Sequence, residues 1–224
     1  MKNYFAGFLL GIKDRYQLSK KEYEAFGSRS DAFNGAMTAL EDDNVNVIGV
    51  YGMGGVGKTI LIREAARQVK EKKLFDEVVF VAVTQTPNML NIQDEIVEKL
   101  GLKIEERSVD ALGIPSIDDH KGCKILMTSR RQEVLKSIGS QKVLPIELLE
   151  EDEAWKLFKN VAGPIAERSD LQPTAEKVTQ KCARLPIAIA TVAKALKHKE
   201  NLYEWKDALE MELSSDVNSA IKMS

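Results

Sequence analysis

The sequence has few of the features that mark secreted, membrane or nucleic-acid-binding proteins. Its 224 residues include only two cysteines, Cys123 and Cys182, without C-x-x-C spacing, which favours reduced, buried thiols and suits the cytosol. No apolar run approaches the ~20 residues that a membrane span needs. Basic and acidic residues nearly cancel, 32 against 34, which argues against nucleic-acid binding driven by net charge. We therefore expect a cytoplasmic globular protein with no membrane span and no nucleic-acid partner.

The N-terminal segment lacks a clear pattern. Its apolar run from Tyr4 to Ile12 follows Lys2 and faintly resembles a signal peptide, but no small-residue cleavage site follows it. A helical remnant is the favoured interpretation of this run. We expect residues 1–25 to form an N-terminal tail.

A glycine-rich segment joins a strand pattern to a helix pattern. The apolar run 45–51 predicts a buried parallel strand, and a helical pattern begins at Lys58. Between them, Gly52, Gly57, Lys58 and Thr59 complete the motif G-x-x-x-x-G-K-[ST]. Glycines let backbone N–H groups point inward, and with the positive end of the helix they form an anion site shaped for a diphosphate. Lys58 would reach the phosphates and Thr59 would offer its hydroxyl to Mg²⁺. The predicted nucleotide-binding residues here are Gly52, Met53, Gly54, Gly55, Val56, Gly57, Lys58, Thr59 and Ile60.

A second acidic element of such sites is missing from the sequence. P-loop ATPases and GTPases hold Mg²⁺ partly through an Asp at the end of a further strand. Residues 102–122 contain no continuous apolar run, and Pro115 argues against a central strand there. For Asp118 and Asp119 we favour a solvated loop over a metal site. Further strands are predicted at 78–83, 124–128 and 142–146, with helices at 30–40, 58–73, 90–100 and 132–137.

Arg130 directly follows the predicted strand 124–128. An arginine there lies at the edge where parallel sheets bind ligands, so a phosphate contact is one interpretation. A surface arginine is the other, and spacing alone does not separate them.

The pattern changes after residue 146. Helical spacing begins at the acidic turn 150–153, at Pro173, at Pro186 and near residue 202, which predicts a small helical bundle. Trp155 and Trp205 each fall on an apolar helical face and are predicted core residues. The predicted fold is therefore α/β, with a P-loop NTPase-type parallel sheet flanked by helices and followed by a small all-helical bundle.

The sequence resembles the NB-ARC nucleotide-binding module of plant intracellular disease-resistance receptors of the coiled-coil type. Segments 49–59, 75–83, 122–130, 153–158 and 182–188 match in order. In this family ADP holds the receptor off and exchange for ATP turns it on. The resemblance implies that Arg130 contacts the γ-phosphate, that Pro186 packs near the nucleotide, and that Arg29 lies in the segment bordering the adenine.

The departures from the family indicate a truncated member. The acidic strand, expected in mid-sheet beside strand 124–128, is missing as an internal deletion near 103–121. Arg184 replaces a glycine and Ile60 a threonine. We expect a coiled-coil remnant at 1–25, a nucleotide-binding domain at 26–146 and an ARC1-like helical subdomain at 147–224.

Three functions fit these features. We favour an ADP- or ATP-binding switch module of a plant immune receptor, acting in the defence response with protein partners. Little or no hydrolysis is expected because the metal-holding Asp is missing, so the chain is not expected to be an enzyme. The alternatives are an active ATPase of the STAND class or another NTPase or kinase, and a non-functional or interaction fragment that folds poorly because its sheet lacks a central strand.

Overall fold

The computed structural model describes residues 4–10, 26–83 and 123–210. Its contacts divide the chain into two units. The sheet unit lies within Met1–Asp14, Asp31–Gly52 and Lys58–Ile146, and the helical unit within Arg15–Ser30, Met53–Gly57 and Glu147–Ser224. Each unit is described by itself below.

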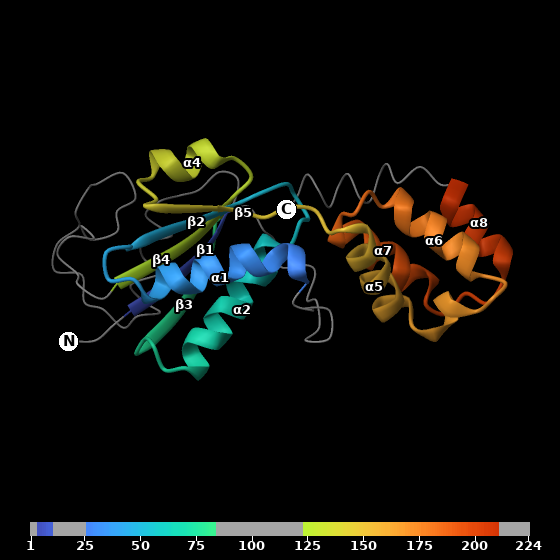
Figure 1. Ribbon diagram of the computed structural model, residues 1–224, viewed down its shortest axis with the longest axis horizontal. Coiled ribbons are helices and arrows are strands. Elements are labelled where there is room, and N and C mark those ends of the chain that lie inside the picture. Colours follow the sequence, from blue (N-terminus) through green and yellow to red (C-terminus); the bar gives the residue numbers. More distant parts are fainter. Residues whose placement is uncertain (1–3, 11–25, 84–122, 211–224) are drawn as a thin grey trace. The chain divides into compact units, whose positions relative to one another are not determined.

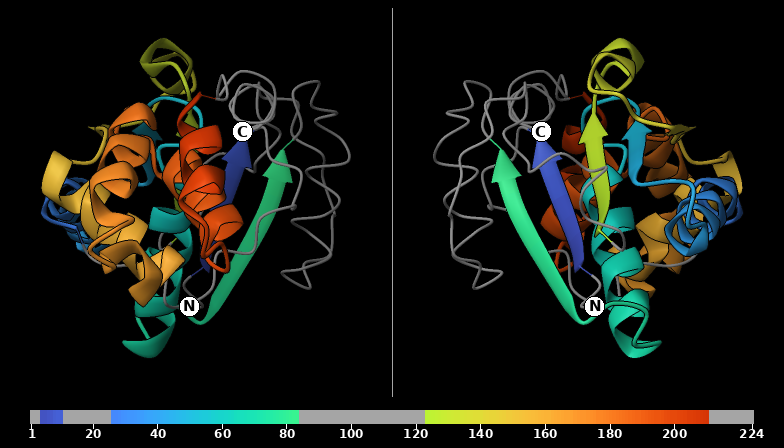
Figure 2. Two further views of the ribbon diagram at one scale, coloured as in Figure 1. Left: turned by 90° about the vertical axis from the view of Figure 1, so that its right-hand side faces the viewer. Right: turned by 90° about the vertical axis from the view of Figure 1, so that its left-hand side faces the viewer.

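The sheet unit is built on five strands that all run parallel, in the order β3-β1-β4-β2-β5 (Figures 1 and 2). The near-continuous apolar runs of the predicted strands suit a parallel sheet whose faces are covered by helices. Pro145 lies in an edge strand, as predicted, where its missing N–H is tolerated. The strands are β1 (Tyr4–Leu10), β2 (Val47–Tyr51), β3 (Glu77–Val83), β4 (Cys123–Ser129) and β5 (Lys142–Pro145).

Helices cover both faces of this sheet. Helix α4 (Gln132–Ser137) packs against β2, β4 and β5, whereas α1 (Gly27–Glu41) and α2 (Lys58–Glu71) lie on the opposite face (Figure 1). The inward residues of α2 recur at helical spacing, and Leu61, Ile62, Ala65 and Val69 are all buried. This arrangement holds the beginning of α2 at the carboxyl edge of the sheet.

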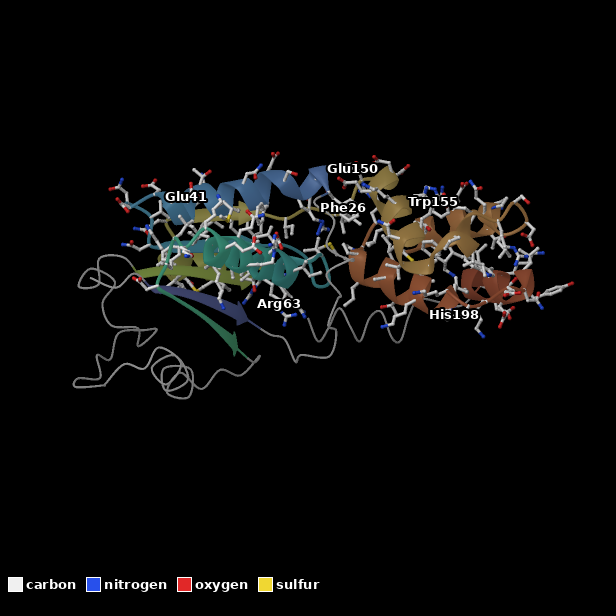
Figure 3. The ribbon with its side chains drawn as sticks, turned by 90° about the horizontal axis from the view of Figure 1, so that it is seen from below. Phe26, Glu41, Arg63, Glu150, Trp155 and His198 are labelled. Carbon is white, nitrogen blue, oxygen red and sulfur yellow. The ribbon has the colours of Figure 1, made fainter. Side chains whose placement is uncertain are left out.

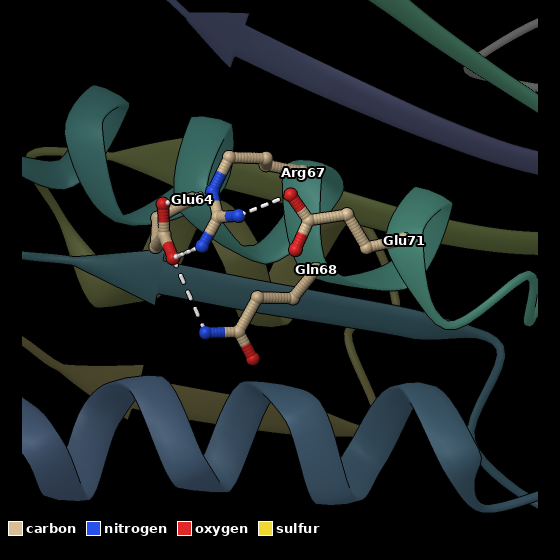
Figure 4. Close-up of polar contacts among 4 residues, drawn as sticks. All are labelled: Glu64, Arg67, Gln68 and Glu71. Atoms are coloured by element: carbon tan, nitrogen blue, oxygen red, sulfur yellow. Dashed lines mark hydrogen bonds and ion pairs between the residues drawn. The ribbon is translucent and has the colours of Figure 1, made fainter. Parts of the chain in front are cut away.

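Polar side chains stabilise the outer surface of α2. Arg67 forms ion pairs with Glu64 and Glu71, at spacings of three and four residues, and Gln68 also donates to Glu64 (Figure 4). Such exposed pairs contribute little to stability, so the apolar face remains the main stabilising feature of the helix.

The helical unit contains four α-helices and one 3-10 turn among its described residues after residue 147. Trp205 and Phe158 are fully buried and lie 6.2 Å apart between ring centroids. The half-buried Trp155 (Figure 3) stacks on Phe158 at 5.9 Å between ring centroids. Trp205 is thus a core residue, as predicted, and Trp155 lies at the edge of that core. The elements are α5 (Glu151–Ala162), η2 (Pro164–Glu167), α6 (Gln172–Lys181), α7 (Pro186–Leu196) and α8 (Leu202–Glu210).

The helical interpretation of the N-terminal run is wrong. Residues 4–10 form strand β1, which pairs with β3 on one side and β4 on the other. A short apolar run without periodicity fits a helix or a buried strand equally well, and long-range pairing decided between them. The predicted tail therefore contributes to the sheet. Residues 102–122 lie outside the described residues, as do Asp118, Asp119 and the predicted helix 90–100.

Both cysteines were predicted to be reduced and buried. Cys182 carries a free, buried thiol, and burial raises its pKa to about 12. The side chain of Cys123 lies outside the described residues. Within the described part of the chain, no helix is long and apolar enough to cross a membrane.

Candidate nucleotide-binding site

Strand β2 ends at the edge where the glycine-rich loop begins. The backbone N–H of Gly52 donates to the carbonyl oxygen of Ser129 at 3.3 Å, which joins the end of β2 to the end of β4. Arg130 follows β4 at this same edge and is exposed. The structure therefore places Gly52 and Arg130 at the carboxyl edge of the parallel sheet, where ligands of α/β folds bind.

Lys58 is the first residue of α2 and its side chain is buried. Its Nζ donates to the carbonyl oxygen of Gly52 at 2.8 Å, so the cation is held at the base of the loop. Burial, and then the positive charge of Arg130, lower the pKa of Lys58 from 10.5 to about 8. A phosphate placed here would supply the negative charge that restores the ammonium form. The site is thus electrostatically prepared for an anion.

Thr59 and Ile60 lie half-buried in the first turn of α2. The backbone N–H groups of a first helical turn point toward an anion at the N-terminus. The proposed role of the Thr59 hydroxyl toward Mg²⁺ stays a prediction. Across residues 4–10, 26–83 and 123–210, no group of three His, Cys, Asp or Glu side chains is placed to hold a metal ion.

The middle of the loop, residues 53–57, belongs to the helical unit. Gly55 and Gly57 have φ values of 75° and 101°, which glycine adopts readily and other residues do not. The Val56 N–H donates to the Met53 carbonyl at 3.4 Å, closing a turn. The backbone is therefore curved as an anion-binding loop requires, with Gly54 and Val56 buried and Met53 exposed.

Arg29 lies near the beginning of α1 and is only 6% exposed. Its Nη1 donates to the carbonyl oxygen of Val56 at 2.7 Å. A Cβ on Gly57 would approach this Nη1 to 2.7 Å, so a side chain at that position would displace the guanidinium. The structure thus brings the predicted Arg29 to the loop, although no base-contacting role follows from this contact.

Helix α7 contacts the loop through Ile187, the residue after Pro186. Pro186 begins α7 and is buried, as a proline at a first helical position can be. The Ile187 N–H donates to the carbonyl oxygen of Gly55 at 3.3 Å, and its side chain fills the space a Cβ on Gly55 would need. The packing of Pro186 near a nucleotide stays a prediction, and the structure shows its neighbour Ile187 in contact with the loop.

Ser28 and Glu153 form a contact that the sequence did not indicate. The Ser28 N–H donates to Glu153 Oε1 at 2.9 Å and the Ser28 hydroxyl donates to Oε2, while the Glu150 N–H donates to Oε2 at 2.9 Å. Burial raises the pKa of Glu153, but these hydrogen bonds and the nearby charge of Arg29 outweigh it, and the pKa lies below its usual value. The E-x-x-E spacing at 150–153 is the only sequence signal, and it concerns the start of α5 alone.

The segment between α6 and α7 adopts a conformation suited to glycine. Ala183 and Arg184 have φ values of 50° and 61°, in the left-handed region. The Arg184 carbonyl accepts a hydrogen bond from the Leu149 N–H at 3.1 Å. The position where a glycine was expected thus keeps its glycine-like backbone with an arginine in place.

Comparison with known proteins agrees with this geometry. The sequence model of the NB-ARC domain family matches residues 30–111 and 103–168. The Arabidopsis thaliana disease resistance protein At4g27190 is 32% identical over 204 residues, covering 76% of this chain and 21% of that protein. The putative Arabidopsis thaliana disease resistance protein At3g15700 is 31% identical, covering 79% of this chain and 56% of that protein. The chain thus spans from about a fifth to about half the length of these relatives.

Two solved structures are similar to the chain at low sequence identity, with TM-scores below 0.5. Domain III of the Thermotoga maritima replication initiation protein DnaA is 17% identical, with a TM-score of 0.47, over 87% of this chain and 96% of that one. A mutant of Thermotoga maritima RuvB is 14% identical, with a TM-score of 0.49, over 82% of this chain and 67% of that one.

The parallel sheet, the glycine-rich turn and the helix that begins at Lys58 define a P-loop nucleotide-binding fold. Within that class, the family match covers more than half of the residues. The chain belongs to the NB-ARC domain family.

Proposed function

We propose that this chain is an ADP- or ATP-binding module of a plant intracellular immune receptor, acting as an ADP-favouring switch fragment in the defence response. The buried ammonium of Lys58, held against the Gly52 carbonyl at the start of α2, is the observation that carries the proposal. Burial and the charge of Arg130 lower the pKa of Lys58, and the phosphates of a bound nucleotide would stabilise its ammonium form. Ligand binding therefore offsets an electrostatic cost built into the site.

The proposed binding residues fall in two groups. Gly52, Lys58, Thr59, Ile60 and Arg130 belong to the sheet unit, and Arg29, the loop residues 53–57 and Pro186 belong to the helical unit. We assign the phosphates to the loop and Lys58, the Mg²⁺ ion to Thr59 when one is bound, and the γ-phosphate of ATP to Arg130. Residues 26–146 and 147–224 are the proposed domain limits, in a cytoplasmic protein with protein partners in immune signalling.

Little or no hydrolysis is part of the proposal. P-loop NTPases hold Mg²⁺ partly through an Asp at the end of a strand, and phosphoryl transfer depends on that charge neutralisation. Strand β4 lies between β2 and β1. The seven residues of β1 contain neither Asp nor Glu. The family match is made in two pieces that meet within residues 103–111, which supports an internal deletion there.

Binding of labelled ADP to the full chain and to Lys58→Ala tests the proposal. The wild-type chain is expected to retain ADP, and Lys58→Ala to lose at least about tenfold in affinity. Lys70→Ala, on the exposed last turn of the same helix, serves as the matched control and is expected to bind as wild type. Equal retention by Lys58→Ala and wild type would rule out the assigned site.

Phosphate release from ATP in the presence of Mg²⁺ tests the proposal that the chain hydrolyses little or no nucleotide. No turnover above the Lys58→Ala background is expected. Magnesium-dependent turnover above that background would instead identify an ATPase of the STAND class. Failure to bind either nucleotide would favour the interaction-fragment function.

A further inference from the structure

Strand β1 occupies the middle of the sheet although it comes first in the described sequence. It lies between β3 and β4 (Figure 2), pairing from Tyr4 opposite Glu77 to Leu10 opposite Val83 on one side. On the other side it pairs from Tyr4 opposite Cys123 to Leu9 opposite Thr128. Seven consecutive residues thus make parallel ladders on both edges.

Strand β3 depends on β1 for its place in the sheet. Among the described strands, β3 pairs only with β1, and β4 pairs with β1 and β2. Neighbouring strands lie about 4.8 Å apart, so the axes of β3 and β4, with one strand between them, are roughly 10 Å apart. Without an occupant, both would present rows of unpaired N–H and C=O groups to this gap.

The gap is where the sequence predicted a missing strand. The sequence predicts that the acidic strand beside residues 124–128 is missing, and the structure has a strand at that place, supplied by residues 4–10. Their aromatic and leucine residues favour strand formation, and an uninterrupted apolar run suits a strand in mid-sheet. This composition suits residues 4–10 to the place between β3 and β4.

We propose that the gap between β3 and β4 is a donor-strand slot, and that residues 4–10 of this chain are its separable occupant. The strand's partners lie more than 65 residues away in the sequence, and neither is joined to it by a tight turn. Its register is therefore set by the slot through backbone pairing, as in peptides that add a strand to a sheet. The slot takes an extended, apolar segment without proline, in parallel orientation. The proposal does not depend on nucleotide binding.

Hydrogen exchange of the full chain without nucleotide is the first test. Amides of residues 4–10 are expected to exchange at least about 100-fold more slowly than in an unstructured peptide, comparably to those of 123–129. Exchange at the rate of an unstructured peptide would overturn the proposal. The sample is also measured by light scattering at several concentrations. A dimer that loses this protection on dilution would show that a second copy fills the slot, which contradicts occupancy by the same chain.

Complementation by a peptide tests separability. Gly7→Pro removes an N–H from the centre of β1 and is expected to expose residues 77–83 to exchange while α5 stays protected. A synthetic peptide of residues 1–13 added in excess is expected to restore protection at 77–83. The same peptide carrying Gly7→Pro is the control peptide, and Glu200→Pro, in an exposed loop of the helical unit, is the control variant. Unchanged exchange at 77–83 in Gly7→Pro, or no recovery with the peptide, would each overturn the proposal.

A disulfide trap covers the case in which Gly7→Pro unfolds the whole chain. Ala6 and Ile125 are direct register partners in adjacent strands, within the Cα separation that a disulfide bridges. In a Cys123→Ser background, the pair Ala6→Cys and Ile125→Cys is expected to form an intrachain disulfide. The shifted pair Ala6→Cys and Thr128→Cys is expected to remain reduced. Equal crosslinking of both pairs would contradict the register.

Discussion

At the scale of single residues, the buried charge of Lys58 favours nucleotide binding but lowers the stability of the nucleotide-free chain. Its buried ammonium has a pKa of about 8 against 10.5 in the unfolded chain, so below pH 8 the folded state holds a charge that it disfavours. We predict that Lys58→Met stabilises the nucleotide-free chain at pH 7 by about 2 kcal/mol while abolishing ADP binding. Urea unfolding without ligand measures the first effect, and Lys70→Met, an exposed lysine of the same helix, is expected to change stability little.

The pH dependence carries the opposite sign from that of a salt-bridged lysine. Because the unfolded chain binds the Lys58 proton more tightly, the wild-type chain gains stability as pH rises from about 8 to 10.5. Lys58→Met lacks this gain, so the difference between the two proteins should shrink across that range. A difference that stays constant or grows would show that the buried charge is not its cause.

Arg184 is strained by its backbone. A non-glycine residue in the left-handed region costs roughly 1–2 kcal/mol, and Arg184 has a φ of 61°. We predict that Arg184→Gly stabilises the chain by about 1 kcal/mol, measured by thermal or urea unfolding. Arg184→Ala is the matched control, because it removes the distant 3.8 Å ion pair with Glu150 but keeps the strain. Equal stability of the glycine and alanine variants would contradict this explanation.

At the scale of elements, helix α7 and the loop fit together at Gly55. A side chain there meets Ile187 and also strains a backbone φ of 75°. We predict that Gly55→Ala destabilises the chain by about 2 kcal/mol and weakens ADP binding. Adding Ile187→Ala should recover part of that stability, because it removes the clash but not the strain. Thermal unfolding of both single variants and the double variant measures the coupling, and strict additivity would exclude a direct clash.

Local sequence patterns were sufficient to predict the elements whose contacts are local. The helices after residue 147 were predicted because apolar spacing marks one face and Pro186 marks a first turn. The loop was predicted because its glycines and Lys58 follow a strand and precede a helix. The motif itself specifies both the backbone and the chemistry in these cases.

Long-range contacts account for what the sequence did not reveal. Strand β1 was mistaken for a helix because a seven-residue apolar run has no distinguishing period and its partners lie far along the chain. Ser28 binding to Glu153, and Ile187 contacting Gly55, depend on how helices pack. Arg29 was identified only through the family resemblance, since nothing in its neighbours predicts that it would be buried against Val56.

At the scale of the whole molecule, the strand pairings of the sheet and the contacts among α5 to α8 differ in how far apart the contacting residues lie in the sequence. Every described strand pairing joins segments more than 65 residues apart, whereas α5 to α8 contact one another within 60 residues. Closing long loops costs entropy before pairing compensates for it, so parallel sheets form slowly. The units are therefore expected to fold at different rates.

Both tryptophans of the chain, Trp155 and Trp205, lie in the helical unit, so tryptophan fluorescence reports that unit alone. Trp205 is fully buried and its indole N–H donates to the Lys199 carbonyl at 2.7 Å, so its fluorescence reports packing of that unit. We predict that, on dilution from urea, tryptophan fluorescence recovers at least about tenfold faster than amide protection of β4 residues 123–129. Stopped-flow fluorescence and pulsed hydrogen exchange measure the two rates. If β4 becomes protected first, the slow step is not sheet closure, and the long-range pairing of β1 does not limit folding.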